Sequence, residues 1–267
     1  MIITLSPSKG QDFEQAPLIS HFSIPQQLKD SQVLVNIVKK HKAPWIKKLM
    51  GVSENLAELN YQRFQKFEQP FNPQNAKQAL FSFTGDVYSG FNLSSMNEND
   101  FLYAQDHLRI LSGLYGSLKP LDLIQAYRLE MKTKLKSSRG DNLYQFWGDR
   151  ITKSLNIDLE NQNEKTVINL ASNEYWKSVN QKSLDANIIN VAFKEVKEGK
   201  SRIIAIFAKK ARGMMADFII RNQIGNSDGI KDFNYENYKF NNAESTSNLF
   251  IFDRPQPAPV TPIKKKK

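Results

Sequence analysis

Apolar positions along the chain form short runs and stripes at helical spacing, and the two patterns follow one another irregularly. Residues 2–5, three of which are apolar, predict a short buried strand, which enters a loop at Ser6. Glu198, Gly199 and Lys200 predict the turn of a hairpin between two later strands. Further strands are predicted over residues 81–83, 167–170, 188–196, 202–208 and 248–252.

Helices are predicted where apolar residues recur every three or four positions. Pro25 fits the first turn of a helix that runs to about Lys40, Pro44 opens a short second helix, and Ser53 caps a third. Because helices and hairpins alternate without a regular βαβα pattern, the sequence favours an α+β fold with a mixed sheet. Further helices are predicted after Asn72, over 97–111, over 143–155 and from about 211 to 225.

The sequence predicts one compact domain over residues 1–254, because neither a repeat nor a Gly/Ser linker divides its 267 residues. Hydrophobic residues make up 40% of the chain and charged residues 24%, which excludes disorder of the whole chain. Residues 255–267 hold four prolines and four lysines but no apolar cluster. We therefore expect them to form a flexible basic tail.

Several classes of site are excluded by composition. The chain has no cysteine, which removes disulfides, thiolate nucleophiles and cysteine-ligated metal centres, and which fits a cytoplasmic protein. The three histidines are scattered, which argues against a histidine-rich zinc or iron site, whereas an oxygen-ligand site built from Asp and Glu stays open. No motif points to a metal or a cofactor, so we predict neither. No apolar run approaches the ~20 residues that cross a membrane, and the N-terminus lacks the features of a signal peptide.

The formal net charge is +10, which favours an anionic partner such as nucleic acid. Four of these charges belong to the last four residues, so the remainder of the chain carries 10 − 4 = +6. The alternative is that the charge reflects a general Lys- and Asn-rich composition with no particular partner.

Residues 44–67 have the pattern of a helix-hairpin-helix motif, with a tight turn before the second helix. Such a turn offers free backbone N–H groups to a DNA phosphate. Met50 replaces the proline of that pattern, Ser53 replaces its second glycine, and the alternative is an ordinary helical pair with a glycine C-cap. The candidate phosphate-binding residues here are Lys47, Lys48, Gly51, Val52 and Ser53.

A second basic cluster consists of Lys209, Lys210 and Arg212, where the sequence predicts that a strand ends and a helix begins. Cations at a helix N-terminus oppose the macrodipole, so their presence suggests that they meet an anion. The alternative is a strand end whose long side chains extend into solvent.

Residues 169–177 follow a predicted buried strand and carry several polar side chains. Ligands commonly bind at the carboxyl ends of strands, which would make Asn169, Ser172 and Glu174 part of a polar site. The alternative is that Ser172 caps a helix on which Glu174 and Lys177 form an ion pair.

Residues 109–131 combine glycines and tyrosines with Arg109, Asp122, Arg128 and Glu130. The glycines match neither a P-loop nor a dinucleotide fingerprint. On a strand, the alternating residues Arg128 and Glu130 would share one face.

The chain resembles the YaaA family of bacterial peroxide-stress resistance proteins from Met1 to about Arg254. Ser8 stands where the family commonly has alanine, and the residues after Arg254 look like an addition. Six segments carry the resemblance in the family's order: SPSK (6–9), FTGDVYSG (83–90), HLRILSGLYGSLKPLDLIQAYRLEM (107–131), LYQFWGD (143–149), NLASNEYWKSV (169–179) and AKKARGMM (208–215).

The resemblance implies a single domain of an uncommon fold with a positively charged cleft and a helix-hairpin-helix element. It also implies a protein that binds duplex or branched DNA with little sequence preference, limits oxidative DNA damage and lowers free iron. The polar positions of the family motifs fall on Lys9, Asp86, Arg109, Arg128, Glu130, Asn169, Ser172, Glu174, Lys177, Lys209, Lys210 and Arg212.

Two functional hypotheses follow. The first is a DNA-binding protein of the hydrogen peroxide response, favoured as a monomer and without a membrane partner, that grips the backbone through its cations. The second is an enzyme acting on a nucleobase, a nucleotide or damaged DNA, because carboxylates weaken a pure phosphate site. In it, Glu130 or Glu174 would be the general base. Scattering of six motif residues would exclude this hypothesis, and their convergence in one pocket would favour it: Lys9, Arg128, Glu130, Asn169, Glu174 and Lys209.

Overall fold

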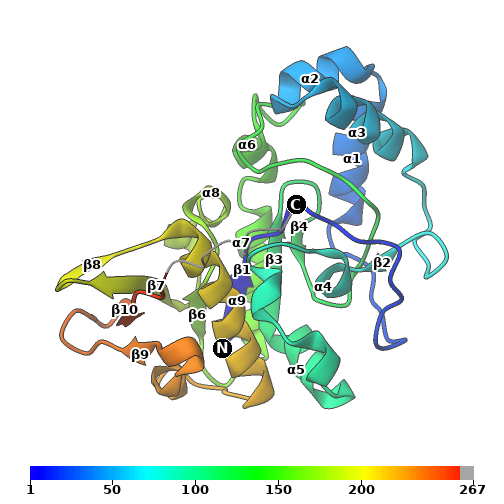
Figure 1. Ribbon diagram of the computed structural model, residues 1–267. Helices are drawn as coiled ribbons and strands as arrows, with labels where there is room; N and C mark the ends of the chain where they lie inside the picture. The colour runs from blue at the N-terminus through cyan, green and yellow to red at the C-terminus, as the bar shows by residue number, and fades with distance from the viewer. Residues whose placement is uncertain (259–267) are drawn as a thin grey trace, which may run out of the picture.

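The computed structural model describes residues 1–258, in which eight strands form one mixed sheet in the order β4-β3-β1-β6-β7-β10-β9, with β8 paired to β7 (Figure 1). β2 (Lys77–Gln78) and β5 (Leu123–Ile124) form a separate two-stranded sheet. The strands of the main sheet are β1 (Ile2–Leu5), β3 (Leu108–Ser112), β4 (Gly116–Leu118), β6 (Thr166–Asn169), β7 (Asn187–Lys197), β8 (Lys200–Arg202), β9 (Lys239–Phe240) and β10 (Leu249–Pro255).

The five inner strands β3, β1, β6, β7 and β10 are parallel, whereas β4, β8 and β9 pair antiparallel at the margins. The described residues also form nine α-helices and several short 3-10 turns. The α-helices are α1 (Leu28–Lys39), α2 (Ala43–Met50), α3 (Glu54–Lys66), α4 (Ala79–Ser82), α5 (Glu98–His107), α6 (Leu143–Trp147), α7 (Arg150–Glu160), α8 (Asn173–Trp176) and α9 (Ala205–Arg221).

The core is centred on β1, whose residues Ile2, Ile3 and Leu5 have no exposed surface. α5, α7 and α9 all pack against this strand, and α9 crosses one face of the sheet (Figure 1). A strand covered on both faces is mostly apolar, and three of the four residues 2–5 are apolar, which is why this strand was predictable. The single α+β domain with a mixed sheet is confirmed.

The helices α1, α2 and α3 form a lobe beside the sheet (Figure 1). α2 ends at Gly51, which adopts the left-handed conformation with φ 61°. Ser53 then caps α3, because its Oγ accepts a hydrogen bond from the Leu56 N–H at 3.4 Å. The second and third predicted helices are therefore confirmed.

The hairpin after β7 is confirmed, but its second strand is short. β8 ends at Arg202, and α9 begins at Ala205, about six residues earlier than predicted. The apolar run 203–208 was interpreted as a strand because a short run of this kind does not distinguish a strand from a helix. The cluster Lys209, Lys210 and Arg212 consequently lies inside α9, and the argument from a helix N-terminus does not apply to it.

Other local predictions were wrong. Residues 81–83 lie in and just after the short helix α4 instead of in a strand. Asn72 caps no helix, because its side chain accepts hydrogen bonds from Gln74 N and Asn75 N in a turn. The stripe 143–155 is buried as expected, but it is divided between α6 and α7 at Gly148, whose φ is 47°.

Element ends were the least predictable feature. α5 is capped by Asn97 as expected but ends at His107, where β3 begins, instead of at about residue 111. α9 ends at Arg221, before Gly225. β10 extends to Pro255, which is paired with Val196, so the predicted tail begins inside the sheet. Residues 259–267 of that tail lie outside the described residues.

No helix in residues 1–258 has both the length and the apolar character needed to span a membrane.

Candidate functional site

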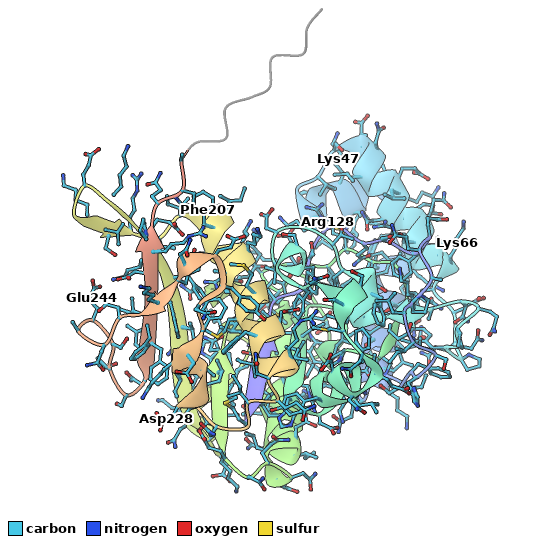
Figure 2. The ribbon with its side chains drawn as sticks, turned by 60° about the horizontal axis from the view of Figure 1, so that its bottom comes forward. Lys47, Lys66, Arg128, Phe207, Asp228 and Glu244 are labelled. Carbon is cyan, nitrogen blue, oxygen red and sulfur yellow. The ribbon has the colours of Figure 1, made fainter. Side chains whose placement is uncertain are left out.

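Two cavities adjoin between the helical lobe and the sheet. The larger, which we call the outer cavity, measures about 900 Å³ and lies between α1, α2 and the irregular segment 128–136. The smaller, which we call the inner pocket, measures about 430 Å³. Arg128, Glu130 and Lys132 line both cavities, so the two form one continuous cleft. Arg128 lines the outer cavity together with Lys48 of α2, and Figure 2 shows it next to the helical lobe that carries Lys47 and Lys66.

The outer cavity is strongly basic. One carboxylate, Glu130, lines it together with five cationic side chains. Its apolar wall includes Trp45, whose ring stacks on His41 with centroids 3.7 Å apart. A surface that combines cations with an aromatic wall is suited to a nucleic acid backbone. The five cations are Lys48, Arg128, Lys132, Lys134 and Lys136.

Three of these lysines were not predicted from the sequence, although an alternating pattern of apolar or small residues and lysines could have identified them. Residues 131–136 alternate, with Met131, Thr133 and Leu135 buried and the intervening lysines exposed. This period of two holds Lys132, Lys134 and Lys136 on the open side of an extended segment. Neither Lys134 nor Lys136 has an ion pair within residues 1–258, so both present an uncompensated charge.

The inner pocket lies where β1 and β6 end. The loop after β1 carries Ser6 and Lys9, and the loop after β6 carries Ser172. The two loops are joined because Ser172 N donates to Ser6 Oγ at 2.8 Å. Ser172 precedes α8, but its side chain contacts Ser6 Oγ at 3.2 Å and makes no capping bond. A pocket lined by polar side chains, Ser172 and Glu174 among them, therefore lies at the carboxyl ends of β1 and β6.

Glu130 holds three of the pocket's cations. Its carboxylate oxygens lie 3.2 Å from Lys9 Nζ, 3.1 Å from Arg128 Nη2 and 3.3 Å from Lys132 Nζ. Burial alone would raise the pKa of Glu130, but the two lysines outweigh it and lower that pKa below the usual value. Glu130 is therefore ionised at neutral pH and acts on its surroundings as a fixed anion.

The opposite wall of the inner pocket comes from α9 and the loop 85–90. Lys209 Nζ lies 3.4 Å from Asp86 Oδ2, and both side chains line the pocket together with Arg212. Burial lowers the pKa of Arg212, and its guanidinium has neither an ion pair nor a hydrogen bond within residues 1–258. Lys210 lies outside the pocket and pairs with Glu236.

Glu174 completes the pocket from the first turn of α8. It accepts a hydrogen bond from Lys132 N at 3.3 Å, and its carboxylate lies 3.8 Å from Lys132 Nζ. Lys177, the predicted partner of Glu174, instead lies over the Tyr144 ring and does not line the pocket. Asn169 also lies outside it, because its side chain bonds Asn190 and Ala171 N at the end of β6.

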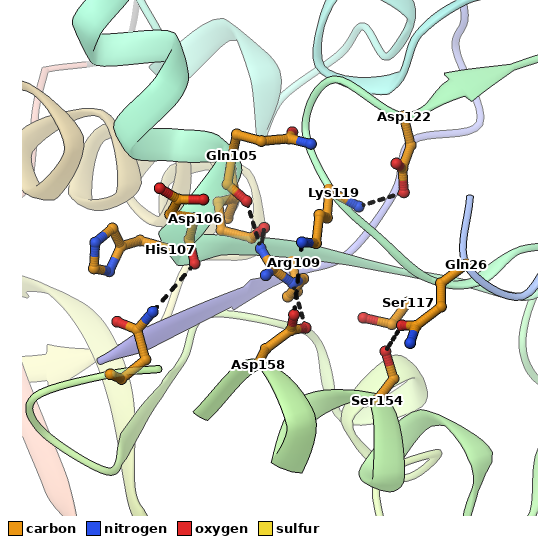
Figure 3. A network of polar contacts seen from close by, with 12 residues as sticks. Gln26, Gln105, Asp106, His107, Arg109, Ser117, Lys119, Asp122, Ser154 and Asp158 are labelled. Atoms are coloured by element: carbon orange, nitrogen blue, oxygen red, sulfur yellow. Dashed lines mark hydrogen bonds and ion pairs between the residues drawn. The ribbon is translucent and has the colours of Figure 1, made fainter. Parts of the chain in front are cut away.

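Arg109 was predicted as a phosphate-binding residue, and the structure overturns that prediction. Its side chain is 2% exposed and its Nε donates to Asp158 Oδ2 at 2.6 Å (Figure 3). Nη1 donates to the carbonyl oxygens of Gln105 and Leu108. Arg109 therefore belongs to a buried network that anchors β3 to α7, away from the basic cleft. Its family motif carried no signal that separates a buried cation from an exposed one.

The hairpin between α2 and α3 is less available to an anion than predicted. The N–H groups of Gly51 and Val52 both donate to Lys47 O, so they are not free. Lys47 Nζ lies 2.6 Å from a carboxylate oxygen of Glu54, which occupies the first turn of α3. A carboxylate at this position competes with a phosphate for the N-terminus of α3. Lys48, by contrast, lines the outer cavity.

No cluster of three or more His, Asp or Glu side chains in residues 1–258 is arranged to hold a metal ion. The acidic residues of the cleft are each engaged by lysine or arginine, which leaves their oxygens committed to cations of the protein itself.

Comparison with known proteins gives a consistent result. The family model described as "Peroxide stress protein YaaA" matches residues 1–244. A UPF0246 protein of Aliivibrio fischeri (strain ES114) is 49% identical over 254 residues, which cover 95% of this chain and 98% of the relative. UPF0246 proteins of Alteromonas mediterranea and Cellvibrio japonicus are 47% and 46% identical, and the matches cover 99% and 100% of those chains and 96% of this one.

Proposed function

This chain belongs to the peroxide stress protein YaaA family, and from that membership and its cleft we propose that it is a DNA-binding protein of the peroxide stress response. In this proposal the basic cleft holds the phosphate backbone of duplex or branched DNA with little sequence preference. The observation that carries it is the lining of the outer cavity, where five cationic side chains face one carboxylate. Occupancy of the DNA, or coupling to its repair, would then limit oxidative damage.

The electrostatics of the cleft support backbone binding over base reading. Lys134 and Lys136 make no ion pair among residues 1–258, so they can attract a phosphate with their full charge, and no carboxylate has to be displaced. Each phosphate that they neutralise releases condensed counterions, which makes the affinity fall steeply with salt. Contacts of this kind position a duplex and carry no sequence information.

The test is a salt series with labelled duplex and four-way-junction DNA. We expect Lys134→Ala/Lys136→Ala to reduce the slope of log K against log salt by about two, because two phosphate contacts are lost. The matched control is Lys153→Ala/Lys182→Ala, which removes the same charge from two exposed lysines outside the cleft. Equal slopes for the two double variants would contradict binding through the cleft.

A second candidate function is an enzyme that acts on a nucleobase, a nucleotide or damaged DNA. The observation that favours it is the convergence of the motif residues in the inner pocket. Of the six residues named for this criterion, only Asn169 lies outside the pocket. The other five line it: Lys9, Arg128, Glu130, Glu174 and Lys209. A pocket for phosphate alone has no need of three carboxylates, which weaken anion binding.

Within this candidate, Glu174 is better suited than Glu130 to act as general base. The lowered pKa of Glu130 makes it a weaker base, and its oxygens are held by three cations. Lys9, Lys209 and Arg212 would hold the anionic part of the substrate. Incubation with damaged oligonucleotides and nucleotides, with mass analysis of the products, tests the enzyme. Product should form with the wild type and be lost in Glu174→Gln.

A further inference from the structure

The guanidinium of Arg212 lies in the inner pocket without a partner. It projects from α9, it is partly buried, and it has no hydrogen bond or ion pair in residues 1–258. Two fully buried arginines show the usual arrangement. Arg109 pairs with Asp158 at 2.6 Å, and Arg254 pairs with Glu195 at 2.9 Å. The donors of a partly buried guanidinium that has no protein acceptor are available to a ligand, and two oxygen atoms of a tetrahedral phosphate accept two parallel hydrogen bonds from its planar fork.

A second unsatisfied donor lies at the same pocket. The Nε of Arg128 is buried and has no hydrogen-bond partner, although its Nη2 donates to Glu130 at 3.1 Å. Arg128 lines both cavities, so its side chain lies at the junction between the inner pocket and the outer cavity. Two guanidinium groups at one pocket therefore lack acceptors that a ligand's oxygen atoms would supply.

The rest of the lining fits more than a bare anion. Five cations and three carboxylates give the inner pocket a net charge of 5 − 3 = +2. Tyr127 and Tyr175 supply aromatic surface, and their hydroxyls have raised pKa values because of burial, so they stay neutral. Carboxylate oxygens accept hydrogen bonds from N–H and hydroxyl groups. A volume of about 430 Å³ lies within the range of small-ligand pockets.

We propose that the inner pocket binds one nucleotide unit, with its phosphate on Arg212 and Lys209, its base against the tyrosines and its hydrogen-bond donors on Glu174. The proposal rests on the proposed function, since it places the pocket beside a DNA path in the outer cavity. Two sources present the same chemistry: a free nucleoside monophosphate, and a nucleotide turned out of a DNA strand.

The first arm of the test measures binding of free nucleotides by calorimetry. Each of the four deoxynucleoside monophosphates is compared with its nucleoside and with inorganic phosphate. We expect at least one monophosphate to bind at least tenfold more tightly than either fragment. Arg212→Gln should weaken it by about 10–100-fold, because a charge-assisted bidentate contact is lost. The control Arg202→Gln alters an exposed arginine of β8 outside the pocket and should bind normally.

The second arm uses a DNA duplex with one unpaired nucleotide, the same duplex with an abasic residue at that position, and the fully paired duplex. If the nucleotide comes from DNA, wild type should prefer the unpaired nucleotide over the abasic residue, and Arg212→Gln should abolish that preference. Thermal unfolding checks that the variant folds, and Lys209→Gln replaces it if it does not.

The outcomes are separable. A preference for the monophosphate over both fragments, or for the unpaired nucleotide over the abasic residue, supports the nucleotide site and identifies its source when Arg212→Gln abolishes that preference. The proposal is overturned if neither preference is found, as when inorganic phosphate binds as tightly as the nucleotides and Arg212→Gln lowers the affinity for all three duplexes equally. Failure of the proposed function appears elsewhere, as unchanged duplex affinity in Lys134→Ala/Lys136→Ala.

Discussion

Gly213 of α9 contacts the backbone of Val87 so closely that a Cβ atom at Gly213 would lie 1.8 Å from the Val87 carbonyl oxygen. Gly90 makes the reciprocal approach, since a Cβ there would lie 2.4 Å from Lys210 O. These two glycines let the loop 85–90 lie directly on α9. That contact brings Asp86 beside Lys209 and forms one wall of the inner pocket.

Gly213→Ala should therefore destabilise the protein and disturb the pocket together. The new methyl group meets backbone atoms, which cannot rotate away, so we expect a loss of about 2 kcal/mol or more in the free energy of unfolding. Urea denaturation measures this. Gly225→Ala is the matched control, because nothing lies within 4 Å of its Cβ and it should change stability by less than ~0.5 kcal/mol. Equal midpoints for the two variants would refute the close contact.

The ion pair between Arg109 and Asp158 predicts a different kind of defect. Asp158→Asn leaves a guanidinium that is 2% exposed without its carboxylate, so unfolding should become easier by about 3–5 kcal/mol. The exposed pair Lys165–Asp185 serves as the control, and Asp185→Asn should change the free energy of unfolding far less, because solvent screens this pair. DNA affinity of the folded Asp158→Asn protein should be unchanged, whereas a selective loss of affinity would restore Arg109 to the binding surface.

Sequence patterns predicted the covered strands and the capped helices well, because those are decided locally. The strand over residues 2–5 carries Ile2 on one face and Ile3 and Leu5 on the other, and Ser53 and Asn97 each form the capping bonds expected of them. The start of α9 was missed because residues 203–208 are apolar enough for either strand or helix. The choice is made by tertiary packing of that helix against β1 and β7, which no local window contains.

The candidate site was predictable as a set of motif residues but not as a geometry. Most of the motif residues do meet in the inner pocket. Arg109, however, has the same side chain as Arg128 and is buried in an ion pair with Asp158, which is 49 residues away in the sequence. Conversely, Lys134 and Lys136 belong to no motif and line the outer cavity. Which cation faces a cleft depends on contacts between distant segments, and a single sequence does not report them.

Acidification provides a third prediction through His107. This side chain is partly buried, stacks on Tyr103 with centroids 4.0 Å apart, and donates from Nδ1 to Met1 O at 2.9 Å. Burial, the largest influence, lowers the pKa of His107 below its value of about 6.5 in an unfolded chain. Between the folded and unfolded pKa values the unfolded chain binds more protons, so stability is full above about pH 6.5 and falls as the pH decreases below it.

His107→Gln should remove that contribution. Urea midpoints of the wild type and the variant are compared at pH 7.5 and pH 5.5. The wild type should lose more stability between the two values than the variant, because only the wild type has this proton to bind on unfolding. Parallel losses in the two proteins would show that His107 does not contribute to the pH dependence.

The hairpin between α2 and α3 and the outer cavity are alternative surfaces for DNA, and variants of the pair Lys47–Glu54 distinguish between them. Lys47 is already neutralised by Glu54 at 2.6 Å, so Lys47→Ala should lower duplex affinity less than Lys134→Ala, whose lysine has no partner in residues 1–258. Glu54→Gln provides the converse measurement. If the hairpin touches DNA, removing this carboxylate should raise affinity about two- to fivefold at low salt, because it frees both Lys47 and the N-terminus of α3. Unchanged affinity in Glu54→Gln, together with a loss in Lys134→Ala, would confine the DNA to the basic cleft.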